Sequence, residues 1–250
     1  MGARAGVEVL RVRRCPALSA ATYRMLVDAA FAPGLRLTIL DFRGNLGFGD
    51  SGGAALCEKI SPRGSLQELL LDDCGLTAAT VAALGVALAP PPACNSAEVT
   101  AVSQPPPRDR IGLGTLSLSG NVLAGAGRSL AALLQARTLE RLNLEGCSLT
   151  GDDVGRLAGG LSASPLQRLN LSRNALDARA AARLALGLRK SELQYLDLVG
   201  CGIVGEEARA GLLQAWSERP RGGDLQLDEA AAPTPRCTEP GCGLACGAEE

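Results

Sequence analysis

Apolar residues recur along the chain in one fixed order: a leucine, two residues, a leucine, one residue, a leucine, two residues, and then Asn or Cys. The clearest copies begin at Leu113, Leu139, Leu166 and Leu193. Three apolar positions at this spacing predict a short strand whose apolar side faces inward. An apolar residue at every third or fourth position then predicts a helix. Because the unit recurs at a nearly constant period, the sequence predicts a stack of strand–helix repeats.

Seven copies of the unit can be traced. Their first residues are Val7, Leu37, Leu66, Leu113, Leu139, Leu166 and Leu193. The last residue of the pattern alternates strictly, as Cys15, Asn45, Cys74, Asn121, Cys147, Asn174 and Cys201. An Asn side chain can bond backbone groups that a turn leaves unpaired, whereas Cys fills the same space with a weaker donor. We therefore interpret this position as structural and not as ligand-binding.

These units resemble leucine-rich repeats, and the Asn/Cys alternation is similar to that of the ribonuclease-inhibitor-like subfamily. The resemblance covers about residues 7 to 217. It implies an α/β horseshoe-shaped solenoid of about seven repeats, with a parallel concave sheet and convex helices. Proteins of this architecture include inhibitors, immune sensors, GTPase activators and ligase adaptors, so the resemblance implies protein binding without identifying a partner.

We assign residues 1–228 to the repeat domain. Within it, residues 90–110 break the period and are bracketed by two proline triplets, which prevent a helix from continuing. They are expected to form a loop outside the solenoid, either as a docking segment or as an inert insertion. Asp224 to Asp228 match the strand part of an eighth unit and could close the sheet.

The two ends of the chain differ in composition. The first unit begins at Val7, so either that unit caps the stack or the chain is a fragment of a longer protein. Residues 229–250 are rich in Ala, Pro, Gly and acidic residues and are expected to be disordered. The spacing of Cys237, Cys242 and Cys246 in this tail does not match a zinc knuckle.

Composition excludes several classes of function. The chain has no histidine, a formal net charge of -1 and only 2% aromatic residues. These features argue against His-based catalysis, His-ligated metals and nucleic-acid binding. No apolar stretch is long enough to span a membrane, and no signal peptide is present. We expect a monomeric, cytoplasmic protein, with the nucleus also possible, that has no cofactor and is not an enzyme.

Four of the nine cysteines occupy the Asn/Cys position of their units. Equivalent positions point in the same direction, and these cysteines lie two units apart, which is too far for disulfide geometry. We expect them to be small buried thiols.

A partner is expected to bind the side chains that flank the buried leucines on the concave face. These side chains are arginine-rich in the first two units, acidic in the third, and neutral and polar in the middle, with Tyr beside Asp in the last. Arginine and tyrosine are enriched at binding hot spots. The candidate binding residues are Arg11, Arg13, Arg43, Asp72, Asn143, Glu145, Asn170, Tyr195 and Asp197.

The function that these observations favour is a non-catalytic scaffold that binds a protein partner through the concave face. One alternative is a regulator of an enzyme, such as a GTPase activator of the Ran type, although residues 228–250 contain only scattered acidic residues where those proteins carry a long acidic run. Another is the repeat region of a larger sensor or adaptor. The chain has no Gly-x4-Gly-Lys-[Ser/Thr] nucleotide-binding motif.

Overall fold

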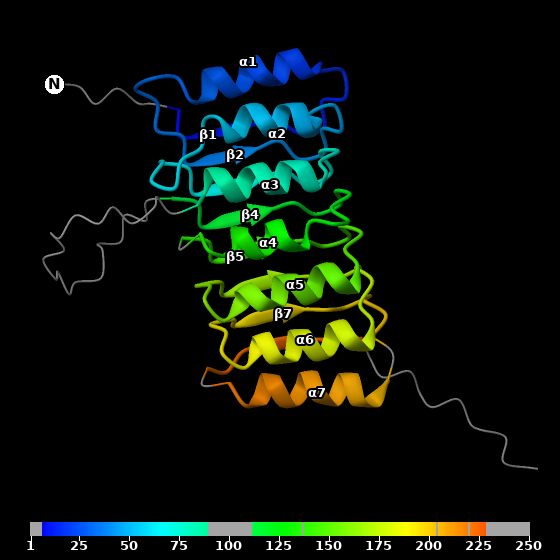
Figure 1. Ribbon diagram of the computed structural model, residues 1–250. Helices are drawn as coiled ribbons and strands as arrows, with labels where there is room; N and C mark the ends of the chain where they lie inside the picture. Colours follow the sequence, from blue (N-terminus) through cyan, green and yellow to red (C-terminus); the bar gives the residue numbers. More distant parts are fainter. Residues whose placement is uncertain (1–6, 90–111, 137, 204, 220, 229–250) are drawn as a thin grey trace, which may run out of the picture.

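The structure is a computed structural model that describes residues 7–89, 112–136, 138–203, 205–219 and 221–228. The expected loop at 90–110 and the expected disordered tail with its three cysteines lie outside these residues. The described residues form one curved stack of strand–helix units (Figure 1).

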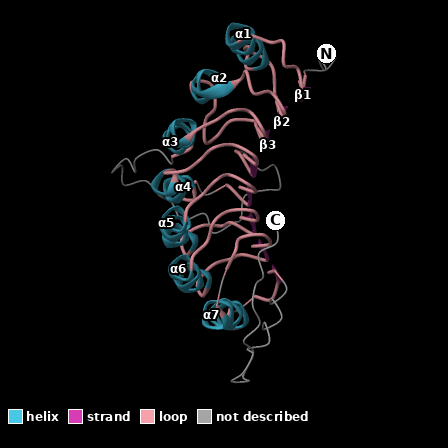
Figure 2. Ribbon diagram, turned by 90° about the vertical axis from the view of Figure 1, so that its right-hand side faces the viewer, coloured by secondary structure: helices cyan, strands magenta, loops and turns pink. Residues whose placement is uncertain are grey.

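Strands and helices alternate strictly along the described chain. The strands are β1 (Val9–Arg11), β2 (Ile39–Asp41), β3 (Glu68–Leu70), β4 (Thr115–Ser117), β5 (Arg141–Asn143), β6 (Arg168–Asn170), β7 (Tyr195–Asp197) and β8 (Asp224–Gln226). The helices are α1 (Ala20–Ala30), α2 (Gly49–Cys57), α3 (Ala78–Ala87), α4 (Gly127–Leu133), α5 (Gly151–Leu161), α6 (Ala178–Leu188) and α7 (Glu206–Ser217). The helices lie on the outer, convex side of the curve and the strands on the inner side (Figure 2).

All strands belong to one parallel sheet whose order follows the sequence from β1 to β8. The second apolar residue of each unit pairs with its equivalent in the next. These residues are Leu10, Leu40, Leu69, Leu116, Leu142, Leu169, Leu196 and Leu225. The predicted repeat register is therefore confirmed, and β8 is the closing strand that the sequence suggested. β3 pairs directly with β4, so the interruption at 90–110 leaves the sheet continuous.

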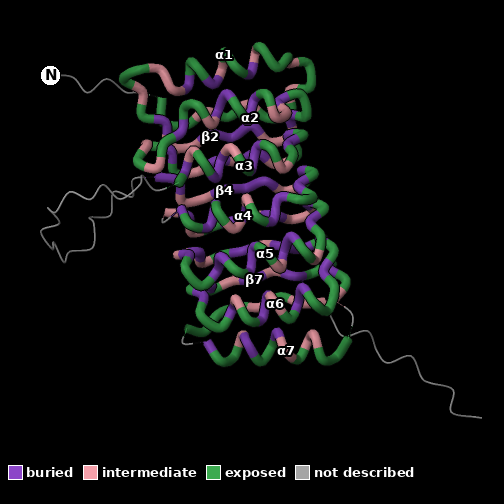
Figure 3. Tube along the Cα trace, in the orientation of Figure 1, coloured by how far each residue is buried: buried purple, intermediate pink, exposed green. Residues whose placement is uncertain are grey.

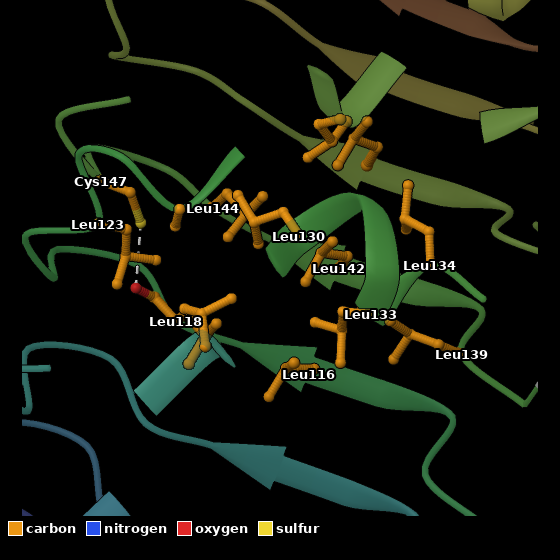
Figure 4. Close-up of a cluster of buried hydrophobic side chains, with 14 of the residues drawn as sticks. Leu116, Leu118, Leu123, Leu130, Leu133, Leu134, Leu139, Leu142, Leu144 and Cys147 are labelled. Atoms are coloured by element: carbon orange, nitrogen blue, oxygen red, sulfur yellow. Dashed lines mark hydrogen bonds between the residues drawn. The ribbon is translucent and has the colours of Figure 1, made fainter. Parts of the chain in front are cut away.

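The core fills the space between the sheet and the helices (Figure 3). In the fourth and fifth units, Leu116, Leu118 and Leu144 are completely buried and Leu142 nearly so. Figure 4 shows these strand leucines gathered against leucines of the neighbouring helix. A strand or helix of this length cannot bury its apolar side alone, so each unit depends on its neighbours for a core.

The Asn at the alternating position bonds two successive turns. The Oδ1 of Asn174 accepts hydrogen bonds from the backbone N–H groups of Cys147 (3.1 Å) and Leu149 (2.9 Å) in the preceding unit. Its Nδ2 donates to the carbonyl of Leu144 in that unit (2.7 Å) and to that of Leu171 in its own (2.8 Å). Asn121 makes the equivalent bonds, and Asn45 makes three of them, with no bond to the N–H of Ala17. The structural interpretation of this position is confirmed.

The Cys side chain at the alternating position donates to the preceding unit and also, over a longer distance, to a carbonyl two residues back in its own unit. The Sγ of Cys74 donates to the carbonyl of Phe42, and the Sγ of Cys147 donates to that of Leu118, each at 3.1 Å. Cys74, Cys147 and Cys201 are buried as expected. Cys15 is only half-buried, because no described unit lies on its N-terminal side. The described cysteines are all free thiols.

Helix starts follow the sequence signals. Ser19, Thr77 and Thr150 each accept a hydrogen bond from a backbone N–H in the first turn of their helix. Thr150 and Asp153 form a complete capping box. Asp153 also accepts bonds from the N–H groups of Gly125 and Gly127 in the preceding unit. Helix capping in this protein therefore also joins adjacent units.

The C-terminal end of the stack is covered by β8 and the end of α7. Trp216 packs against the core and donates from Nε1 to the carbonyl of Gly223 (3.1 Å). The guanidinium of Arg219 lies 3.3 Å from the centre of the Trp216 ring and donates to the carbonyl of Leu193. Trp216 therefore covers the core at this end of the stack.

We predict that Asn174→Ala destabilises the protein more than Cys147→Ala. The first change leaves several buried backbone groups without a partner and should cost about 3–5 kcal/mol. The second removes one weak donor and a small volume and should cost about 1–2 kcal/mol. Equilibrium urea unfolding, followed by circular dichroism, measures both. Equal losses in the free energy of unfolding would show that the Asn174 hydrogen bonds contribute no more to stability than the Cys147 side chain does.

Candidate functional site

The concave face consists of the side chains that flank the central buried leucine of each strand. The strand register places them in continuous rows across the sheet. Arg11, Asn143, Asn170 and Asp197 lie in one such row, and Tyr195 lies in the row on the other side of the buried leucines. Of the other candidate residues, Arg13, Arg43, Asp72 and Glu145 come two residues after their strands end.

The first two units contain a buried carboxylate held by two arginines. Asp41 is completely buried. It accepts hydrogen bonds from the Nε of Arg13 (2.6 Å) and from the Nε and Nη2 of Arg43 (both 3.0 Å). Burial alone would raise the pKa of Asp41, but the hydrogen bonds from Arg43 and Arg13 outweigh it and hold that pKa below its ordinary value. The hydrogen bond to Asp41 in turn raises the pKa of Arg43.

This arrangement changes the interpretation of the arginine-rich end. The sequence named Arg13 and Arg43 as candidate binding residues, and the structure shows that both are paired with Asp41. Asp41 was not among the candidate residues. Its position in the same row as Arg11, with one arginine after the preceding strand and one after its own, is the signal that could have identified it.

Asp72 is connected to the next two units. Its Oδ1 accepts hydrogen bonds from the hydroxyl of Ser117 and from the backbone N–H of Ser119 (2.9 Å). The Nδ2 of Asn143 donates to the same hydroxyl (3.1 Å). Burial raises the pKa of Asp72 despite these hydrogen bonds. The middle of the concave face is therefore a connected polar network.

Four Asp or Asn side chains in one row bond their own backbone. The Oδ1 atoms of Asp41, Asn143, Asn170 and Asp197 each accept a hydrogen bond from the N–H two residues further on, at 2.9–3.2 Å. Bonds of this kind stabilise the turn that follows the strand. Asn143, Asn170 and Asp197 thus have a structural role, which the sequence interpretation missed, in addition to any binding role.

The last units contain an arginine–tyrosine row. Arg141, Arg168 and Tyr195 are aligned neighbours on β5, β6 and β7. The guanidinium carbon of Arg168 lies 6.0 Å from the centre of the Tyr195 ring, within the range of a cation–π interaction. The Tyr195 hydroxyl donates to Asp197 at 3.4 Å. Burial, followed by the nearby Asp197 charge, raises the pKa of Tyr195.

A hollow of about 320 Å³ adjoins this row. Its lining includes Arg168, Tyr195 and Arg221. Arg221 forms an ion pair with Glu192 at 2.6 Å, and Glu145 pairs more weakly with Arg173 at 3.5 Å. Arg141 and Arg168 are exposed, and neither makes an ion pair within the described part of the chain. They are the concave-face positions, besides Arg11, where positive charge is uncompensated.

The described residues include the cysteines and carboxylates that could take part in chemistry. Among them, no group of three or more His, Cys, Asp or Glu is arranged to hold a metal. Burial raises the pKa of the Cys74 and Cys147 thiols to about 12, so both are protonated and unreactive at neutral pH. No helix within the described segments has the length and apolarity to cross a membrane.

Comparison with known proteins supports a leucine-rich repeat architecture. A family model described as "Leucine Rich repeat" matches residues 37–57. The chain is 35% identical over 157 residues to NACHT, LRR and PYD domains-containing protein 5 from Bos taurus. That alignment covers 61% of this chain and 12% of the bovine protein, so the chain spans only a small part of this relative's length.

A solved structure shares the fold over most of the chain. In the crystal structure of the Rad7 and Elc1 complex in yeast, the matching chain is 18% identical with a TM-score of 0.56. The match covers 91% of this chain and 52% of the yeast chain. At this identity the likeness concerns the fold alone. The comparisons do not identify the subfamily, so the similarity to ribonuclease-inhibitor-like repeats stays a prediction.

We predict that Asp41→Asn destabilises the protein at neutral pH by about 2 kcal/mol or more, because it removes a buried charge from between two arginines. The difference from wild type should shrink as the pH falls. A carboxyl whose folded-state pKa is depressed contributes stability above its unfolded pKa of about 3.9, and this is lost as the pH falls through the folded pKa. Urea unfolding between pH 7 and pH 3 measures the difference.

Asp72→Asn is a control, because its stability difference from wild type should change with pH in the opposite direction. Because burial raises the pKa of Asp72, the folded state binds a proton more readily than the unfolded state. Wild type should therefore gain stability relative to this variant as the pH falls. If both variants followed the same trend, the ion pairs of Asp41 would not be the source of its pH dependence.

Proposed function

We propose that this leucine-rich repeat protein is a non-catalytic scaffold that binds a protein partner through its concave face. The observation that carries the proposal is the row of registered strands whose polar side chains are fixed by hydrogen bonds before any partner binds. Side chains that are already ordered lose less conformational entropy on binding, and a preformed surface therefore binds more tightly.

The charge distribution supports recognition of a specific partner. The first units carry Arg13 and Arg43 around a buried carboxylate, the middle is neutral, and Arg141 and Arg168 lie toward the other end. Charge complementarity of this kind orients a partner and excludes others. A monomer in the cytoplasm or nucleus, without a cofactor, is part of the same proposal.

The test is a partner-capture experiment with two variants, each of which carries two substitutions to arginine. Thr115→Arg with Ser119→Arg adds bulk and charge to the centre of the concave face, at side chains for which the described structure has no hydrogen bond. Ala82→Arg with Ala182→Arg makes the same change at exposed positions on the convex helices. Proteins captured from lysate of the source cells are compared by quantitative mass spectrometry.

We expect the concave variant to capture at least tenfold less of each specific partner than the wild type does. The convex variant should capture the same amount as the wild type. Circular dichroism and thermal unfolding check that both variants fold. Equal capture by wild type and the concave variant would place the binding surface elsewhere and contradict the proposal.

A second proposal concerns the length of the protein. The 35% identity to a small part of a much longer NACHT, LRR and PYD domains-containing protein favours the view that this chain is the repeat region of a larger sensor or adaptor. In that case the concave face would bind a ligand protein, and an effector part would lie elsewhere in the polypeptide.

An immunoblot of the source cells tests this second proposal. An antibody against the fourth to seventh units should detect a band well above 25.6 kDa if the chain belongs to a larger polypeptide. A single band near 25.6 kDa, absent after knockdown of the transcript, would contradict it.

A further inference from the structure

We propose that the partner presents an extended acidic segment to Arg141 and Arg168, an inference that rests on the concave-face proposal. The first step is a comparison of the arginines on this face. Arg13 and Arg43 direct their guanidinium groups at the buried Asp41. Arg141 and Arg168 have no acidic partner within the described residues. Arg11 on β1 is also without an ion pair among the described residues, but only β5 and β6 place two such arginines side by side on this face.

The two arginines are spaced to act together. They are directly aligned neighbours on adjacent parallel strands, so their backbones are about 4.8 Å apart. Each guanidinium can bind a carboxylate through two parallel N–H···O bonds. An extended chain advances about 3.4 Å per residue and points alternate side chains to the same side, so acidic side chains two residues apart can reach both arginines.

The surroundings favour an acidic peptide over an isolated anion. Tyr195 continues the row on β7, and its ring lies against the guanidinium of Arg168. The hollow beside Arg168 and Tyr195 gives a side chain room to enter. The Oδ1 of Asn170 is occupied by Ser172, so its Nδ2, which makes no hydrogen bond in the described structure, remains as a donor for the same acidic segment.

Negative charge limits how far the acidic contact extends. Asp224 follows Tyr195 in the same row on β8, and Asp197 lies on β7. An acidic residue placed over β8 would be repelled by Asp224. The acidic part of the segment is therefore positioned over β5 and β6, with the aromatic ring of Tyr195 marking its end.

The test uses a random library of 12-residue peptides displayed on phage and selected against the full chain. Selected peptides are synthesised with a fluorescent label, and their affinities are measured by fluorescence anisotropy. The test variant is Arg141→Glu with Arg168→Glu. The matched control is Arg128→Glu with Arg156→Glu, which makes the same change in net charge at exposed positions on the convex helices α4 and α5.

We expect the selected peptides to be rich in Asp and Glu. Their affinity should fall at least tenfold for the Arg141/Arg168 variant and less than twofold for the control. Arg141→Lys with Arg168→Lys should have an intermediate effect, because Lys keeps the charge but cannot form the two-bond contact. Raising the salt concentration should weaken binding of the wild type.

The failures of the two proposals are distinguishable. Neutral or basic peptides that bind wild type but not Thr115→Arg with Ser119→Arg would overturn the acidic inference and leave the concave-face proposal standing. Acidic peptides that bind both charge-reversed variants equally and are unaffected by Thr115→Arg with Ser119→Arg would overturn both. Recovery of no peptide above background would also overturn the acidic inference.

Discussion

The structure depends on one hydrogen-bonding requirement that recurs at every turn. When the chain leaves a strand, the carbonyl of the third apolar position faces the next unit. In each successive unit described, the residue at the Asn/Cys position donates to that carbonyl, with Asn45 bonding Val12, Cys74 bonding Phe42 and Cys201 bonding Leu171 as examples. Because buried carbonyls need a partner, this single position aligns each unit on the one before it.

The alternation of Asn and Cys divides the stack into pairs of units. Asn174 accepts from the N–H of Cys147, but a Cys side chain does not return this bond to the preceding Asn unit. At this position, therefore, the two units of a pair are joined by more hydrogen bonds than successive pairs are. The interruption at 90–110 falls between Cys74 and Asn121 in the sequence, yet the backbone N–H of Cys74 donates to the Oδ1 of Asn121 at 3.0 Å, as in the uninterrupted pairs. After Cys201 no Asn follows, and Asp228 accepts from Gly200 to complete the last turn.

The sequence was sufficient to predict the fold, but it was not sufficient to predict which charged side chains on the surface pair with one another. The leucine period predicts the register because every unit must bury the same positions, and Thr150 with Asp153 predicts a helix start because capping is local. The pairing of Asp41 with Arg13 and Arg43 depends on side-chain distances within and between two adjacent units, which the leucine pattern does not specify. The half-exposed Cys15 also departs from expectation, because its environment depends on a neighbouring unit and not on its own.

The bonds that make the concave face rigid also determine what it can bind. A side chain that fixes a turn or neutralises a neighbour, such as Asp41 or Asp72, is no longer fully available to a partner. The choice of partner therefore depends on charged side chains whose neighbours on the adjacent strands do not carry the opposite charge. Arg141 beside Arg168 is such a case, since like charges on adjacent strands repel and are tolerated only where solvent or a partner screens them. In the proposed complex, an acidic contact from the partner would convert this repulsion into binding free energy and would make these two positions the most selective part of the face.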